Sequence, residues 1–172
     1  MQDDRILNLA SRTLSAANWL NWGFGAGFIV ALLMSFVFRD PLAAQLASKY
    51  HGRNVAETIT ILRVMALLSI PVALALHQIF TRLHAIVGTV RAGDPFVVAN
   101  AARLQRIGWA LLTLQLLDFA VGGIVAILDQ LGVDHGTWTP GLIGWIAVLM
   151  IFVLARVFRA GAAMRDDLAM TV

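Results

Sequence analysis

The sequence contains no cysteine and few charged side chains. Without cysteine, disulfides, thiolate metal sites and cysteine nucleophiles are excluded. Only 13% of the 172 residues are charged and 59% are hydrophobic, whereas soluble domains have roughly 25% charged and about 45 to 50% apolar residues. A soluble fold could not bury that much apolar surface, so the composition predicts a membrane protein.

Signatures of known catalytic chemistry are missing as well. The chain has no HExxH, phosphate loop, Ser/His/Asp set or glycine-rich nucleotide fingerprint. His77 and His84 lie seven residues apart on one helical face but lack a third metal ligand at fitting spacing. We therefore expect neither an enzyme nor a metal site, and no cofactor.

The basic residues do not form a nucleic-acid footprint. Although the net charge is +3, the 13 lysines and arginines are scattered singly or in pairs beside apolar segments. Phosphate recognition needs basic side chains gathered on one face. Direct nucleic-acid binding is therefore not expected.

Four apolar runs are long enough to cross a bilayer as helices. They cover approximately residues 19–38, 59–80, 107–131 and 141–158. Together with their short connections they use almost the whole chain. The sequence thus predicts an all-α integral membrane protein with four transmembrane helices, a single membrane domain over residues 1–172 and the lipid bilayer as its surroundings.

A helical hairpin is predicted between the second and third spans. Residues 81–106 keep helical spacing of apolar side chains among polar ones. In its middle, Gly93 suits the end of one helix, while Asp94 and Pro95 suit the N-cap and first position of the next. Nine arginines flank the side that carries the termini and this hairpin, against four basic residues opposite. The positive-inside rule therefore places both termini and the hairpin in the cytoplasm.

Asp118 lies almost midway along the third apolar run. An aspartate at the centre of a spanning helix costs roughly 2.5 to 3.5 kcal/mol, so it needs a partner, water or a proton. One interpretation is a proton or ion site with Gln115 one turn earlier and His77 of the second run at fitting depth. The other is a protonated Asp118 that makes one hydrogen bond between two helices. Both remain open at this point.

Two further features of the spans allow two interpretations each. Arg63 and Asp129 should lie at similar depth near the outer ends of the second and third spans, where they form an ion pair or Arg63 extends towards the headgroups. The spans also contain glycines that line a pore or allow close helix contact, namely Gly23, Gly25 and Gly27 in the first span and Gly122 and Gly123 in the third.

Two segments resemble a known family. They are GDPFVVANAARLQRIGWALL (93–112) and ARVFRAGAAMRDDLAMTV (155–172), and they are similar to the bacterial family called domain of unknown function 2975, whose members are small four-span membrane proteins. The residues that carry the resemblance are Gly93, Pro95, Phe96, Asn100, Leu104, Ile107 and Gly108, then Arg156, Arg159, Gly161, Asp166, Asp167, Thr171 and Val172. The resemblance implies a multi-pass protein of the bacterial inner (plasma) membrane. Many members look to be encoded beside a small helix-turn-helix regulator, which implies a soluble DNA-binding protein as partner.

The cytoplasmic hairpin and the C-terminal tail are the candidate surface for this partner. The residues concerned are Asp94, Pro95, Phe96, Asn100, Arg103, Arg159, Asp166 and Asp167. We therefore expect a non-enzymatic, membrane-bound regulatory partner. The alternatives are that the hairpin merely packs on the tail against anionic lipid, a small proton or cation transporter that uses Asp118, or an accessory subunit of a larger membrane complex. A homo-oligomer is compatible with each.

Overall fold

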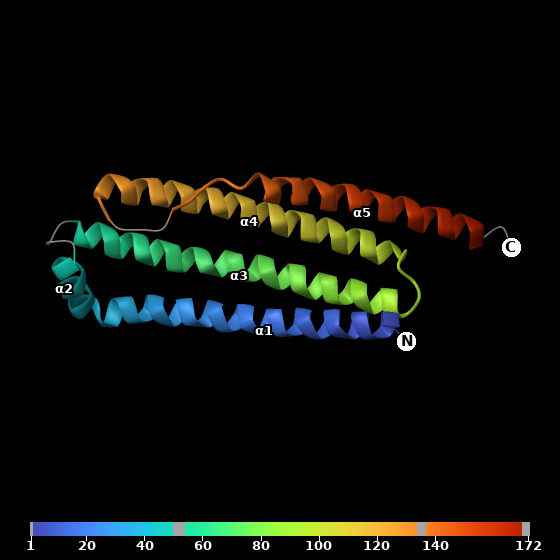
Figure 1. Cartoon of the computed structure of the whole chain (residues 1–172), viewed down its shortest axis with the longest axis horizontal. Helices are drawn as coiled ribbons and strands as arrows, with labels where there is room; N and C mark the ends of the chain where they lie inside the picture. Colours follow the sequence, from blue (N-terminus) through green and yellow to red (C-terminus); the bar gives the residue numbers. More distant parts are fainter. Residues whose placement is uncertain (1, 50–53, 134–136, 170–172) are drawn as a thin grey trace. The chain divides into compact units, whose positions relative to one another are not determined.

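The computed structural model describes residues 2–49, 54–133 and 137–169, and all regular secondary structure in these ranges is helical. The helices are α1 (Gln2–Val37), α2 (Arg39–Lys49), α3 (Val55–Arg91), α4 (Val98–Leu131) and α5 (Leu142–Ala169) (Figure 1). Thr171 and Val172, two of the residues that carry the resemblance, lie outside the described residues.

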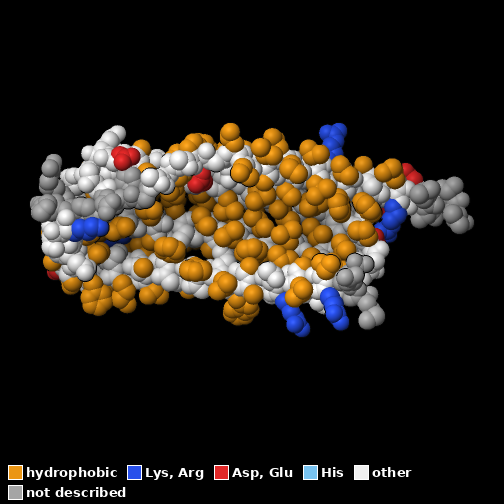
Figure 2. Space-filling view, viewed as in Figure 1, with side chains coloured by type: hydrophobic (Ala, Val, Ile, Leu, Met, Phe, Trp, Pro, Cys, Tyr) orange, Lys and Arg blue, Asp and Glu red, His pale blue; other side chains and the backbone are white. Residues whose placement is uncertain are grey.

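Within the described residues, four helices are long and apolar enough to cross a membrane. They are Arg5–Val37, Val55–Arg91, Val98–Leu131 and Leu142–Asp167. Their most apolar stretches are only 11 to 22% buried, so large apolar side chains face outward, among them Trp19, Phe24 and Ile143 at 79, 69 and 84% exposed. Figure 2 shows hydrophobic side chains over most of the face in view. Such a surface is stable in lipid and not in water, which makes the chain a multi-pass membrane protein with four candidate spans.

Helices α3 and α4 are longer than a bilayer requires. They contain 37 and 34 residues, which correspond to roughly 50 to 55 Å at about 1.5 Å per residue, against a hydrocarbon core of about 30 Å. Pro71 lies inside α3 without ending it, as membrane helices tolerate. The excess length agrees with the helical spacing that the sequence shows on either side of Gly93.

Helix α3 ends where the sequence predicts, but α4 begins later than predicted. Gly93 has φ of 80°; its N–H donates to the Val90 carbonyl, and the Asp94 N–H donates to the Thr89 carbonyl, both at 3.0 Å. This pair of bonds is a Schellman motif. The start of α4 at Pro95 was wrong, since the helix starts at Val98. The physical reason is that the Asp94 carboxylate binds an arginine of α5 instead of capping α4.

The chain forms two compact units. Unit 1 contains Met1–Asn21, Leu74–Gln115 and Gly141–Val172, and unit 2 contains Trp22–Ala73 and Leu116–Pro140. Helices α1, α3 and α4 therefore contribute residues to both units.

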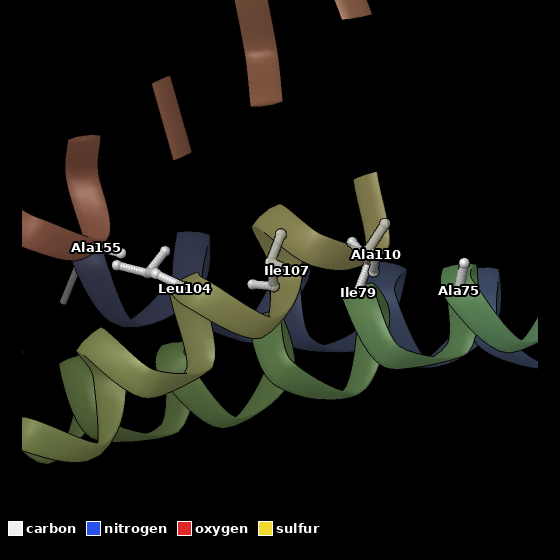
Figure 3. Packing of buried hydrophobic residues seen from close by; sticks show 6 residues of the cluster. All are labelled: Ala75, Ile79, Leu104, Ile107, Ala110 and Ala155. Atoms are coloured by element: carbon white, nitrogen blue, oxygen red, sulfur yellow. The ribbon is translucent and has the colours of Figure 1, made fainter. Parts of the chain in front are cut away.

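The core of unit 1 lies where α3, α4 and α5 meet (Figure 3). Its residues on α3 and on α4 recur at intervals of three or four, which places them on one face of each of these helices, and α5 contributes one residue. They are Ala75, Ile79, Leu104, Ile107, Ala110 and Ala155. Three of the six are alanines, and small side chains let membrane helices approach closely.

Unit 2 is held by small residues and helix-end contacts. Gly25 of α1 faces Ala73 of α3, because a Cβ built on this glycine would lie 3.4 Å from the alanine Cβ. Asn54 Nδ2, just before α3, donates to the Leu131 carbonyl at the end of α4, at 2.9 Å. Gly132, with φ of 66°, follows that end. The start of α3 and the end of α4 are thus fixed to each other.

Replacing Gly93 tests the turn after α3. We expect Gly93→Ala to destabilise the protein by about 1 kcal/mol or more, because a Cβ is strained at positive φ. Gly88→Ala is the matched control, since Gly88 lies inside α3 and a Cβ there meets nothing within 4 Å; alanine should stabilise that position. Thermal unfolding of both variants in the same detergent measures the difference, and equal melting temperatures would contradict the assignment.

Candidate functional site

A buried asparagine holds the turn between α3 and α4. Asn100 is 0% exposed. Its Nδ2 donates hydrogen bonds to Thr89 Oγ1 at 2.7 Å and to the Pro95 carbonyl at 2.8 Å. Its Oδ1 accepts one from Arg103 Nη1 at 2.7 Å. Both N–H groups and the oxygen of the amide are therefore paired, as burial requires.

The ring of Phe96 attaches this turn to α5. The ring centroids of Phe96 and Phe158 lie 5.3 Å apart, with an angle of 38° between the planes. Gly161 makes room for the ring, because a Cβ built there would lie 2.9 Å from Phe96 Cδ1. Phe96 remains 43% exposed, so part of its ring is accessible while the rest contacts α5.

An ion pair joins the same turn to the end of α5. Arg165 Nη1 donates to Asp94 Oδ1, and the two side chains are 50 and 39% exposed. A pair this exposed contributes about 0 to 1 kcal/mol, so it fixes position more than it adds stability. We call residues 94–103 and 158–167 together the turn platform.

Most of the residues that the sequence assigns to a partner surface make contacts inside this platform. Asn100 is buried, Arg103 bonds to it, and Asp94 is paired with Arg165. Arg159 Nη2 donates to Gln105 Oε1 on α4 at 2.9 Å. These side chains build the surface and are not all free to contact a partner.

The exposed side chains of the platform form a different set. Val98 and Met164 are 61 and 62% exposed, and Phe96 is partly accessible. Asp166 and Asp167 are also exposed. Sequence reasoning missed Val98 and Met164, because an apolar residue next to a membrane helix carries no signal that separates a docking contact from a lipid contact.

Comparison with known proteins assigns the chain to a family. The family model described as "Protein of unknown function (DUF2975)" matches residues 41–172. The chain belongs to the DUF2975 family. No curated protein and no solved structure matches it. The DUF2975 match contains α3, α4, α5 and the whole turn platform.

Helix α1, which precedes the DUF2975 match, binds α3 through polar side chains. Ser11 Oγ lies 2.9 Å from His84 Nε2, and Asn18 Oδ1 lies 2.8 Å from His77 Nδ1, both hydrogen-bond distances. Arg91 donates to Asn8 Oδ1. A cavity of about 340 Å³ lies along this seam. It is lined by Leu14, Ser15, Asn18, Phe80, Thr81 and His84.

The spacing of this polar seam explains its geometry. On α1 the positions 8, 11, 15 and 18 alternate steps of three and four residues, and on α3 the positions 77, 84 and 91 are seven residues apart. This is the seam spacing of two helices that pack side by side, where polar residues fix register. The spacing is visible in the sequence and was the signal for Asn8, Ser11 and Asn18, which sequence reasoning missed.

Three polar residues are predicted to cluster in the membrane, and each of them contacts a residue outside that cluster. His77 contacts Asn18 of α1. Gln115 lies over Gly144 of α5, where its side-chain amide occupies the space that a Cβ would fill. Asp118 Oδ1 accepts a hydrogen bond from Trp138 Nε1 at 3.2 Å. The common site of all three residues stays a prediction.

Trp138 closes over Asp118 from the segment before α5. Its ring meets Phe119 edge to face, with centroids 5.9 Å apart and an angle of 68°. Gly122 provides the space for the indole, since a Cβ there would lie 2.6 Å from Trp138 Cζ2. A Cβ on Gly123 would meet nothing within 4 Å. Gly122 therefore allows close contact with the Trp138 ring, and the pore interpretation of the glycine pair stays a prediction.

Arg63 is bound to α1 by three interactions. Its Nε donates to Ser35 Oγ at 3.0 Å, its Nη2 donates to the Ser35 carbonyl at 2.6 Å, and its guanidinium lies 3.9 Å from the centroid of the Phe36 ring. These contacts give the Arg63 guanidinium hydrogen-bond acceptors and an aromatic ring on the protein itself. The pair with Asp129 stays a prediction.

Removal of the Asn100 amide should weaken the turn platform. We expect Asn100→Ala to reduce stability by about 1 to 3 kcal/mol, because the Thr89 hydroxyl and the Pro95 carbonyl lose their buried donor. Thr113→Ala is the control, since that hydroxyl is exposed and donates to the Trp109 carbonyl of its own helix. Melting temperatures in one detergent decide the matter, and similar values for the two variants would show that Asn100 does not hold the turn.

Substitutions of Gly122 and Gly123 in α4 test whether the Trp138 indole covers Asp118. Gly122→Ala should destabilise the protein and displace the indole of Trp138, whereas Gly123→Ala should leave stability unchanged or raise it. Thermal unfolding gives the first result. Accessibility of Trp138 to a water-soluble quencher, measured with the other four tryptophans changed to phenylalanine, gives the second. An unchanged Gly122→Ala protein would mean that Trp138 does not rest on this glycine.

Proposed function

We propose that this protein is a non-enzymatic regulatory partner in the bacterial inner membrane, which binds a small soluble DNA-binding regulator of the helix-turn-helix type through the turn platform. Binding would keep the regulator at the membrane and away from DNA. The single observation that carries the proposal is the attachment of the α3–α4 turn to the end of α5. Membership of the DUF2975 family is consistent with it.

The attachment of the α3–α4 turn to α5 supports docking, because it orders the surface before a partner binds. Asn100, the Phe96 ring and the Asp94–Arg165 pair fix the turn at three separate points. A surface that is already ordered loses less conformational entropy on binding than a loop that must fold on its partner.

The side chains left exposed suit contact with a protein. Val98, Met164 and part of Phe96 supply apolar area, and Asp166 supplies charge beside it. Protein interfaces combine an apolar centre with a polar rim in this way. The distribution of arginines supports a cytoplasmic position for this surface, where a soluble regulator would meet it.

The Asp118–Trp138 contact argues for a structural role of this carboxylate. A hydrogen bond from an indole gives the acid a partner on the protein itself, which is what burial in a membrane demands. The alternatives of a transporter and of an accessory subunit have no described contact in their favour. They stay predictions.

Site-specific photocrosslinking tests the proposal in the intact membrane. A photoreactive amino acid at Val98 or Met164 should give an adduct with one small helix-turn-helix protein, identified by mass spectrometry. The same group at Val153 is the control, because Val153 is 64% exposed on α5 within the predicted fourth span and should face lipid. Adducts that are the same at all three positions would contradict the proposal.

Substitution variants provide the second arm of this experiment. Val98→Glu and Met164→Glu should abolish co-purification of the regulator, since a charge in the apolar centre opposes binding, while the melting temperature stays near that of the wild type. Val153→Leu should retain the regulator. Retention by both glutamate variants would overturn the assignment of the surface.

A further inference from the structure

A groove with a volume of about 510 Å³ lies between α4 and α5 in unit 1. Gln105 of α4 forms one wall, and six residues of α5 form the rest. The residues of α5 are Phe152, Ala155, Arg156, Arg159, Ala160 and Ala163. We call this space the basic groove, because it contains two arginines and no acid.

The floor of the groove is apolar and fixed in place. The Phe152 ring meets Trp109 edge to face, with centroids 5.5 Å apart and an angle of 80°. It also rests on Gly108, where a Cβ would lie 3.0 Å from the ring. Ala155 is only 4% exposed and lines the groove beside Phe152. The helices are thus held in contact at Phe152 and leave a hollow one turn further along α5.

The rim of the groove is cationic. Arg156 and Arg159 are exposed and lie three residues apart, hence on neighbouring positions of one helical face. Arg159 donates one N–H to Gln105 Oε1 at 2.9 Å, which holds its guanidinium at the groove and leaves its other N–H groups for an anion. Guanidinium groups bind phosphate oxygens in bidentate geometry.

The order of these groups along α5 matches the order of groups in a phospholipid. The apolar run of the fourth span ends near residue 158, so Arg156 and Arg159 lie at the level of the headgroups. Phe152 lies four residues deeper, which is about 6 Å along the helix. A bilayer lipid beside α5 therefore presents its phosphate to the arginines and the start of its acyl chain to the apolar floor. A soluble phosphate would use only the rim.

We propose that the basic groove binds an anionic phospholipid, with its phosphate on Arg156 and Arg159 and one acyl chain over Phe152 and Ala155. Basic hollows between membrane helices suit such headgroups. The groove shares Arg159, Ala160 and Ala163 with the turn platform, but the positions that test regulator docking, Val98 and Met164, lie outside its lining. Failure of either proposal leaves the other standing, because their tests use different ligands and different residues.

Native mass spectrometry of the detergent-purified full-length protein measures the binding directly. Phosphatidylglycerol should bind at least about tenfold more tightly than phosphatidylcholine of the same chains, because phosphatidylcholine has the same phosphate but adds a quaternary ammonium, whose positive charge the two arginines repel. Inorganic phosphate in the millimolar range should not displace the lipid. Equal affinity for the two lipids, or displacement by phosphate alone, would overturn the proposal.

Two variants locate the lipid in the groove. The double change Arg156→Gln and Arg159→Gln should reduce affinity for phosphatidylglycerol about tenfold or more, and Arg106→Gln should not, because Arg106 is an exposed arginine of α4 outside the lining. Ala160→Trp keeps both charges and fills the space, and it should also prevent binding. Ala160 is exposed, so this variant should fold. Normal lipid binding by Ala160→Trp would place the lipid elsewhere and refute the assignment.

Discussion

Lipid tails offer no hydrogen bonds, so each polar side chain that the long helices place among apolar surroundings must find its partner on the protein. The polar contacts of this protein follow from that constraint. Asp118 has the indole of Trp138, Arg63 has Ser35, and His77 has Asn18. Each contact joins two segments far apart in sequence. The requirement for pairing therefore also determines which helices lie side by side.

Apolar side chains alone do not select a neighbour in a membrane, because lipid is as apolar as they are. Complementary shape does select a neighbour. In this protein the same arrangement recurs, in which a glycine leaves space for an aromatic ring. Gly108 lies against Phe152, Gly122 against Trp138, and Gly161 against Phe96. Each aromatic ring belongs to a different segment from its glycine. Within each unit, close contacts of this kind hold helices and turns in one arrangement, and polar pairs fix their register.

Much of the architecture was predictable from local pattern. The four apolar runs became four candidate spans, and the Gly93 helix end agrees with its Schellman hydrogen bonds. The start of α4 at Pro95 was wrong, because the Asp94 carboxylate that suits an N-cap pairs instead with Arg165, 71 residues away. The spacing of polar residues on α1 is visible in the sequence, but it was not recognised as a contact with α3. The partners Trp138 and Phe158 carry no local signal at all.

The sequence by itself determined the class of the protein, the number of candidate spans and which polar residues needed partners, because composition and periodicity govern how a segment partitions into lipid. Only the tertiary structure decided that Asn100 is interior while Val98 and Met164 are exposed, and that two arginines of α5 border a hollow with an apolar floor. The exposure of a side chain and the shape of a cavity depend on which residues of other helices lie beside it. These neighbours are set by packing between segments far apart in sequence, which no local pattern encodes.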